Sequence, residues 1–128
     1  MEYSGLLYDR LIPPRYSDPM EIRAYTTATG QQPFRTWYDA LHRPAKERVT
    51  RALMQIANGN LSNTKSAGSG VLEFRIDFGP GYRVYFGRDG QHVAVLLAGG
   101  DKRRQQRDID AAITWWAEYK TTKREDRT

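Results

Sequence analysis

The 128-residue chain has the length of one ordinary domain, and its 39% hydrophobic and 27% charged residues are typical of a globular protein rather than a disordered one. It has no cysteine and two histidines, which excludes disulfides, thiolate chemistry and cysteine-based metal sites and gives no indication of a histidine-based zinc site. The formal net charge of +5 favours anionic partners such as nucleic acid, an acidic protein or anionic lipid.

Residues 1–19 are predicted to form an N-terminal extension. They contain the pair Pro13-Pro14 and a further Pro19, with little periodicity. Met20 could itself start translation, so an arm and a misassigned start both remain open. The stretch lacks the basic start and long apolar centre of a signal peptide, and no apolar run in the chain approaches the ~20 residues of a membrane span. We therefore expect a cytoplasmic protein without membrane contact.

A strand and two helices are predicted next. The segment "MEIRAYTT" from Met20 is typical of a strand, and Pro33 and Pro44 each suit the first turn of a helix. Apolar residues follow each proline at helical spacing, and Gly59 suits the end of the second helix. The second helix also carries basic residues away from its apolar stripe, which are more typical of a solvent-facing side than of a contact with nucleic acid but stay candidates for one: Lys46, Arg48 and Arg51.

The Gly- and Ser-rich stretch 61–70 is predicted to be a loop with Lys65 in its middle. Three strands are expected at 71–78, 82–88 and 92–98, because apolar and polar residues alternate and two turn sequences, "GPG" and "RDGQ", separate them. The third run, "HVAVLLAGG", is nearly continuously apolar and suits a central strand covered on both faces.

A last helix is predicted in "QQRDIDAAITWWAEYK", followed by a charged tail at 121–128. The order strand, two helices, three-strand meander, helix predicts a single α+β domain over residues 20–120 with a mostly antiparallel sheet. We expect the helices to pack on one side of the sheet, and the tryptophans to serve packing.

The polar face of the predicted hairpin is the candidate site. Arg75, Arg83 and Tyr85 must point away from the buried residues of their strands, since strand side chains alternate with period two. Lys65 approaches from the preceding loop, and the rim is expected to hold a basic run after the third strand: Lys102, Arg103 and Arg104. Convergent cations beside a tyrosine suit a phosphodiester backbone and splayed bases. The alternative is an exposed ion-pair ladder of Arg75 with Glu73 and Asp77, which would have no function.

Two motifs bear a family resemblance: "GVLEFRIDFGPGYRVYFGRDG" and "VLLAGGDKRRQQRDIDAAITWW". Together with the upstream segments they resemble the RelE/ParE toxin superfamily over residues 20–118, in particular the phage-derived addiction module killer proteins, which are HigB-like. The resemblance implies a RelE-like fold and a toxin of a type II toxin–antitoxin system. It also implies a cognate antitoxin, often a helix-turn-helix DNA-binding protein.

The resemblance further implies a metal-independent, cofactor-free mRNA endoribonuclease that acts on the translating ribosome. In such an enzyme a ribose 2′-OH attacks the adjacent phosphate. Arg75 and Arg83 would stabilise the phosphate, Lys65 would serve as base or as electrostatic stabiliser, Tyr85 would orient the nucleotide, and Lys102 would contact the backbone. Alanine at Arg75 or Arg83 is expected to abolish toxicity while the domain stays folded.

The sequence departs from other RelE-like nucleases, because it lacks their His-Tyr type of tail and shows no evident Glu–His acid/base pair. The acid and the base therefore remain unassigned. Two other functions stay open, a ParE-like inhibitor of DNA gyrase and a non-catalytic, toxin-derived binding module.

Overall fold

The computed structural model describes residues 19–127, which form an α+β domain as predicted. Residues 1–18, and with them almost all of the predicted extension, lie outside the described residues, as does residue 128. The strands are β1 (Glu21–Ala24), β2 (Thr64–Gly68), β3 (Val71–Ile76), β4 (Tyr82–Asp89) and β5 (Val93–Asp101). The helices are α2 (Pro33–Asp39), α3 (Arg43–Ala57), the 3-10 turn η1 (Lys102–Arg104) and α4 (Gln105–Arg127).

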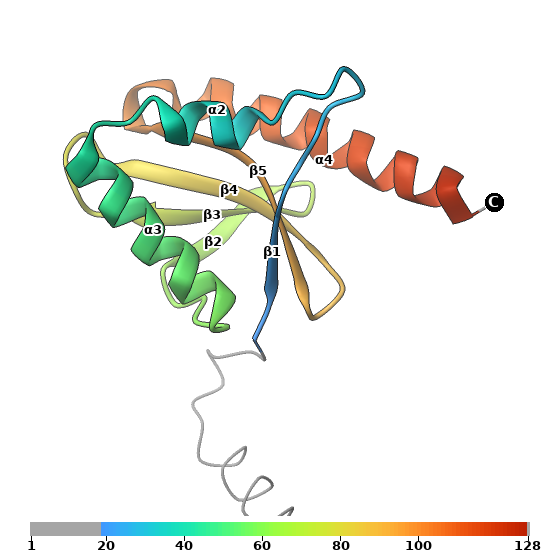
Figure 1. Ribbon diagram of the computed structural model, residues 1–128, viewed down its shortest axis with the longest axis horizontal. Coiled ribbons are helices and arrows are strands. Elements are labelled where there is room, and N and C mark those ends of the chain that lie inside the picture. The colour runs from blue at the N-terminus through green and yellow to red at the C-terminus, as the bar shows by residue number, and fades with distance from the viewer. Residues whose placement is uncertain (1–18, 128) are drawn as a thin grey trace, which may run out of the picture.

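The sheet has the order β1-β5-β4-β3-β2 (Figure 1). β1 pairs parallel to β5, and the other neighbours pair antiparallel, so the predicted mostly antiparallel sheet is confirmed. The meander has one strand more than predicted. Residues 64–68, predicted as part of a loop, form β2, because the turn at Ser69 and Gly70, both at positive φ, folds this segment back onto β3.

Helices cover both faces of the sheet, so the expectation that all of them pack on one side is wrong (Figure 1). On one face, α2 and α3 bury Phe34, Val49 and Ile56 against Val84 and Phe86. On the other face, α4 packs Ala112 and Trp116 against residues of β3, β4 and β5: Val71, Tyr85, Val95 and Leu97. The prediction that 92–98 is covered on both faces is confirmed, and α4 provides the second cover.

The helices begin where the sequence predicts. Pro33 and Pro44 lie in the first turns of α2 and α3, where the missing amide hydrogen leaves no helical hydrogen bond unmade. The Tyr38 hydroxyl lies 2.7 Å from that of Thr50 and joins the two helices. At the other end of the chain, the predicted charged tail is not separate, because α4 continues through Arg127.

Two adjacent glycines of β5, Gly99 and Gly100, allow α2 and α4 to approach the sheet closely. A Cβ on Gly99 would come within 2.0 Å of the Trp37 ring, and a Cβ on Gly100 within 1.9 Å of Asp108 Oδ2. Because consecutive strand residues face opposite sides, Gly99 admits a side chain from α2 and Gly100 one from α4. The two glycines thus place the start of α4 close against the end of β5.

Candidate functional site

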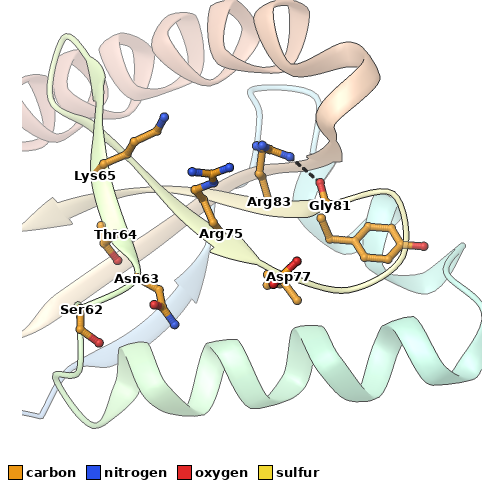
Figure 2. Close-up of a pocket in the computed structure, with 10 residues that line it drawn as sticks. Ser62, Asn63, Thr64, Lys65, Arg75, Asp77, Gly81 and Arg83 are labelled. Carbon is orange, nitrogen blue, oxygen red and sulfur yellow. Dashed lines mark hydrogen bonds between the residues drawn. The ribbon is translucent and has the colours of Figure 1, made fainter.

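A pocket of about 600 Å³ opens at the end of the sheet where β3 turns into β4 (Figure 2). Its lining residues come from β2 and the segment before it, from β3 and from the start of β4: Ser62, Asn63, Thr64, Lys65, Arg75, Ile76, Asp77, Gly81, Tyr82 and Arg83. Three of the four residues that the sequence suggested for catalysis, Lys65, Arg75 and Arg83, therefore line one cavity. Figure 2 shows their side chains projecting from three neighbouring strands on the side of the sheet where α4 lies.

Strand pairing explains why the three cations converge. Arg75 of β3 pairs directly with Arg83 of β4, so both lie on one face. Lys65 of β2 pairs with Glu73, two residues before Arg75, and therefore shares that face. Lys65 reaches the pocket from a strand rather than from the predicted loop, so the ladder of β2 and β3 fixes its position.

The two arginines lie in different environments. Arg83 is buried, with 4% of its surface exposed; its Nη1 donates to the Gly81 carbonyl oxygen at 2.6 Å, and its Nε lies 3.8 Å from Glu73 Oε1. Gly81 has a φ of +82°, which favours glycine, and this backbone turn directs its carbonyl at the guanidinium (Figure 2). Arg75 is exposed, and within residues 19–127 its guanidinium forms no ion pair.

Glu73 completes the cluster, and the sequence reasoning did not assign it a place in the site. Its side chain is fully buried and lies 3.6 Å from Lys65 Nζ, and its Oε1 accepts a 2.8 Å hydrogen bond from Gln105 Nε2 at the start of α4. The ion-pair ladder considered as an alternative exists in part, but it joins Glu73 to Lys65 and Arg83 and leaves Arg75 out. The available signal was a glutamate between two apolar residues, Leu72 and Phe74, in a strand whose opposite face is core.

Tyr85 points away from α2 and α3 as expected, but it is not open to solvent. α4 covers that part of the face, and Tyr85 is fully buried, paired in register with Glu73 and Ala98. Burial, together with the nearby Glu73 carboxylate, raises the pKa of Tyr85. A buried ring cannot stack on a nucleotide base, so the structure does not place Tyr85 where its predicted role requires.

The basic residues after β5 do not line the pocket, and Lys102 lies next to it. Lys102, Arg103 and Arg104 form η1 and are exposed, and Asp101 caps this turn by accepting the Arg103 amide hydrogen at 2.9 Å. Lys102 lies beside Gly81, since a Cβ on that glycine would be 3.8 Å from the Lys102 Cβ. Lys102 therefore adjoins the pocket at its Gly81 end.

The basic residues of α3 do not reach the pocket. α3 covers the opposite face of the sheet, and none of its cations lines the cavity. Arg48 lies 4.6 Å from the centre of the Phe78 ring, and Lys46 lies 6.0 Å from that of Tyr38. Both arrangements, like the exposed Arg51, are those of the solvent-facing side of a helix.

The described part of the chain brings together no three histidine, aspartate or glutamate side chains that could hold a metal ion. None of the helices between residues 19 and 127 is both long and apolar enough to cross a membrane.

Comparison with known proteins identifies the family. Residues 36–116 match the phage-derived Gp49-like proteins (DUF891), and this span contains α3, β2 to β5 and the pocket. An uncharacterized protein of Haemophilus influenzae is 37% identical over 94 residues, which cover 73% of this chain and 91% of that protein. No solved structure matches the chain. The chain belongs to the phage-derived Gp49-like family, which is part of the RelE/HigB-like toxin superfamily.

Proposed function

We propose that the protein is the toxin of a type II toxin–antitoxin pair, of the HigB-like addiction module killer type, and that it cuts mRNA on the translating ribosome. Membership in the Gp49-like family supports the toxin role. The observation that carries the nuclease proposal is the convergence of Lys65, Arg75 and Arg83 from three strands into one pocket. An antitoxin, for which we expect a helix-turn-helix DNA-binding protein, neutralises it.

The proposed reaction is an internal transfer that requires no external nucleophile. The ribose 2′-oxygen forms a bond to the adjacent phosphorus while the bond from phosphorus to the 5′-oxygen breaks. A base takes the 2′-OH proton and an acid gives one to the departing 5′-oxygen, which leaves a cyclic phosphate and a 5′-hydroxyl. Negative charge grows on the non-bridging oxygens, and cations placed beforehand around them lower the barrier.

The three cations suit different parts of this task. Arg75 is exposed and forms no ion pair among residues 19–127, although Asp77 lines the same pocket, so it binds the scissile phosphate from the pocket mouth. Lys65 supplies charge from the β2 side, where its ion pair with Glu73 makes it an electrostatic stabiliser. The buried Arg83, oriented by the Gly81 carbonyl, presents a fixed guanidinium edge to the cavity. Lys102 and Arg104 guide the RNA strand at the rim.

Primer extension on a defined mRNA in a reconstituted translation system tests the proposal. The protein should produce cuts at codon-linked positions only when ribosomes are present, and Arg75→Gln should reduce their rate by about 100-fold, the typical cost of one oriented charge at a transition state. Arg35→Gln, which removes an exposed arginine of α2, is the matched control and should cut like the parent protein.

Two other outcomes of this assay would indicate a different function. Intact mRNA together with growth arrest and DNA damage in expressing cells would indicate a gyrase-inhibiting toxin. Intact mRNA without growth arrest would indicate a non-catalytic binding module.

A further inference from the structure

The least expected group at the pocket is the carboxylate of Glu73, because it lies behind the cavity and not on its surface. Its side chain is fully buried, and the pocket lining includes its partners Lys65 and Arg83 but not Glu73 itself. Burying a carboxylate is costly unless charge and hydrogen bonds compensate. A substrate in the pocket would meet the cations first, so Glu73 can influence it only through them.

The contacts of Glu73 are looser than those of a purely structural ion pair. Gln105 donates a hydrogen bond to it at 2.8 Å, and the buried hydroxyl of Tyr85, which is paired in register with Glu73, also interacts with the carboxylate. Lys65 Nζ at 3.6 Å and Arg83 Nε at 3.8 Å lie beyond hydrogen-bond distance. Over the described residues, Oε2 has no hydrogen-bond partner. Structural pairs with arginine are typically short and bidentate. Here the carboxylate attracts both cations without hydrogen-bonding either of them, so the exposed ammonium of Lys65 is available to a second anion and the buried Arg83 keeps a place in the pocket lining.

The position of Glu73 in the sheet makes it the common neighbour of the two cations. It lies on β3, directly opposite Lys65 on β2 and diagonally opposite Arg83 on β4. Two cations at one end of a cavity repel each other, and a carboxylate between them offsets that repulsion. Arg75, two residues further along β3, forms no ion pair within residues 19–127: Asp77 lines the same pocket, but the two side chains are not paired.

We propose that Glu73 is a positioning residue for phosphate recognition in RNA cleavage: from behind the pocket it holds Lys65 and Arg83 where both face the scissile phosphate, and leaves Arg75 free to capture it. This inference rests on the proposed nuclease function. Through Gln105, Glu73 also ties the pocket to the first turn of α4, next to the basic rim of η1. The substrate class that this arrangement recognises is a single phosphodiester of single-stranded RNA.

The substitution Glu73→Gln tests the charge alone. Glutamine has the same shape and can still accept the hydrogen bond from Gln105, but it no longer attracts the two cations. We expect kcat for RNA cleavage to fall by about 10- to 100-fold, since small displacements of catalytic groups have effects of this size. KM should not rise, because removing a negative charge from a cationic pocket does not weaken its attraction for phosphate. Glu73→Asp, which keeps the charge, should recover part of kcat.

The matched control is Asp89→Asn. Asp89 is also a carboxylate that pairs with a lysine on the α4 side of the sheet, but it contacts Tyr119 and Lys123 at the far end of α4 and does not line the pocket. It should lose stability without losing kcat. If Glu73→Gln keeps the parent kcat, or if both Glu73 variants lose activity only in proportion to their loss of thermal stability, the inference is wrong.

A second readout does not depend on cleavage. Nitrogen-15 NMR should show the buried Arg83 Nε–H exchanging slowly with solvent in the parent protein and at least several-fold faster in Glu73→Gln. Unchanged exchange would overturn the positioning role. Failure of the parent protein to cut RNA, together with the expected NMR change, would instead reject the nuclease function and leave the role of Glu73 in placing Arg83 supported.

Discussion

Arg83→Met is expected to destabilise the fold, whereas Arg75→Met is not, although both arginines line the same pocket. The Arg83 side chain is 5% exposed and its partner Glu73 is fully buried. Removing one member of a buried ion pair costs about 3–5 kcal/mol. Lys65 and Gln105 still contact Glu73 in the variant, and the 3.8 Å separation is long, so the loss lies near the lower end.

The hydrogen bond from Arg83 to the Gly81 carbonyl adds to this loss by about 1 kcal/mol. The sum is roughly 4 kcal/mol, a large part of the 5–15 kcal/mol by which domains are stable, and it corresponds to a fall in Tm of about 16 °C at ~4 °C per kcal/mol. For the exposed Arg75 we expect a change within about 0.5 kcal/mol.

Urea and thermal unfolding of both variants, followed by circular dichroism, measure these differences. The double variant Glu73→Gln/Arg83→Met should be more stable than Arg83→Met alone, because it no longer contains a buried carboxylate short of a partner. A stability of Arg83→Met within about 1 kcal/mol of the parent protein would refute the reasoning. If the reasoning is correct, lost toxicity in an Arg83 variant does not by itself identify a phosphate contact, and Arg75 is the cleaner test.

Three further predictions concern packing, pH and RNA binding. Gly99→Ala should cost about 3 kcal/mol in urea unfolding, because its Cβ overlaps the Trp37 ring, and should cost less in a Trp37→Leu background. Burial and the hydrogen bond to Glu118 raise the pKa of Tyr25 from 10.0 to about 12. The folded protein therefore holds this proton more tightly than the unfolded chain, so the stabilisation is complete below pH 10 and is lost as pH rises toward about 12. Tyr25→Phe should accordingly show a shallower alkaline fall in unfolding free energy, and an unchanged slope would contradict the assignment. In fluorescence titrations with single-stranded RNA, Arg75→Gln should reduce the slope of log K against log salt by roughly 0.7, while Arg51→Gln on α3 should leave it unchanged.

The strands and helices could be predicted because their signals are local. Period-two alternation in 71–78 and 82–88, the GPG turn, and the prolines that open α2 and α3 each depend on a few neighbouring residues. β2 could not be predicted in this way. Its sequence, TKSAG, contains no alternation, and it is a strand because β3 offers an edge to pair with across a tight turn.

The sequence contained enough information to predict that helices cover both faces of the sheet. A strand that is apolar on both faces, as 92–98 is, needs helices on both sides, and α2 and α3 can cover only one of them. The pattern of "HVAVLLAGG" therefore conflicts with the expectation that all helices pack on one side. This pattern implies that α4 lies on the face of Tyr85. The structure adds which residues of that face it covers: Tyr85 is buried, while Arg75 is exposed.

The position of α4 also explains why Arg83 is buried and Arg75 is exposed. Alternation places Glu73, Arg75, Arg83 and Tyr85 on one face without indicating which of them α4 covers. Because Gly100 allows α4 to start close against β5, its first turn reaches Glu73 through Gln105 and covers the face from there toward Tyr85. Arg83 lies at the boundary, where it is buried yet still lines the pocket, and a buried guanidinium there requires a carboxylate within the sheet. Glu73 thus offsets the charge of the buried Arg83 at this end of the face, while the guanidinium of Arg75 is exposed and forms no ion pair with any residue between 19 and 127.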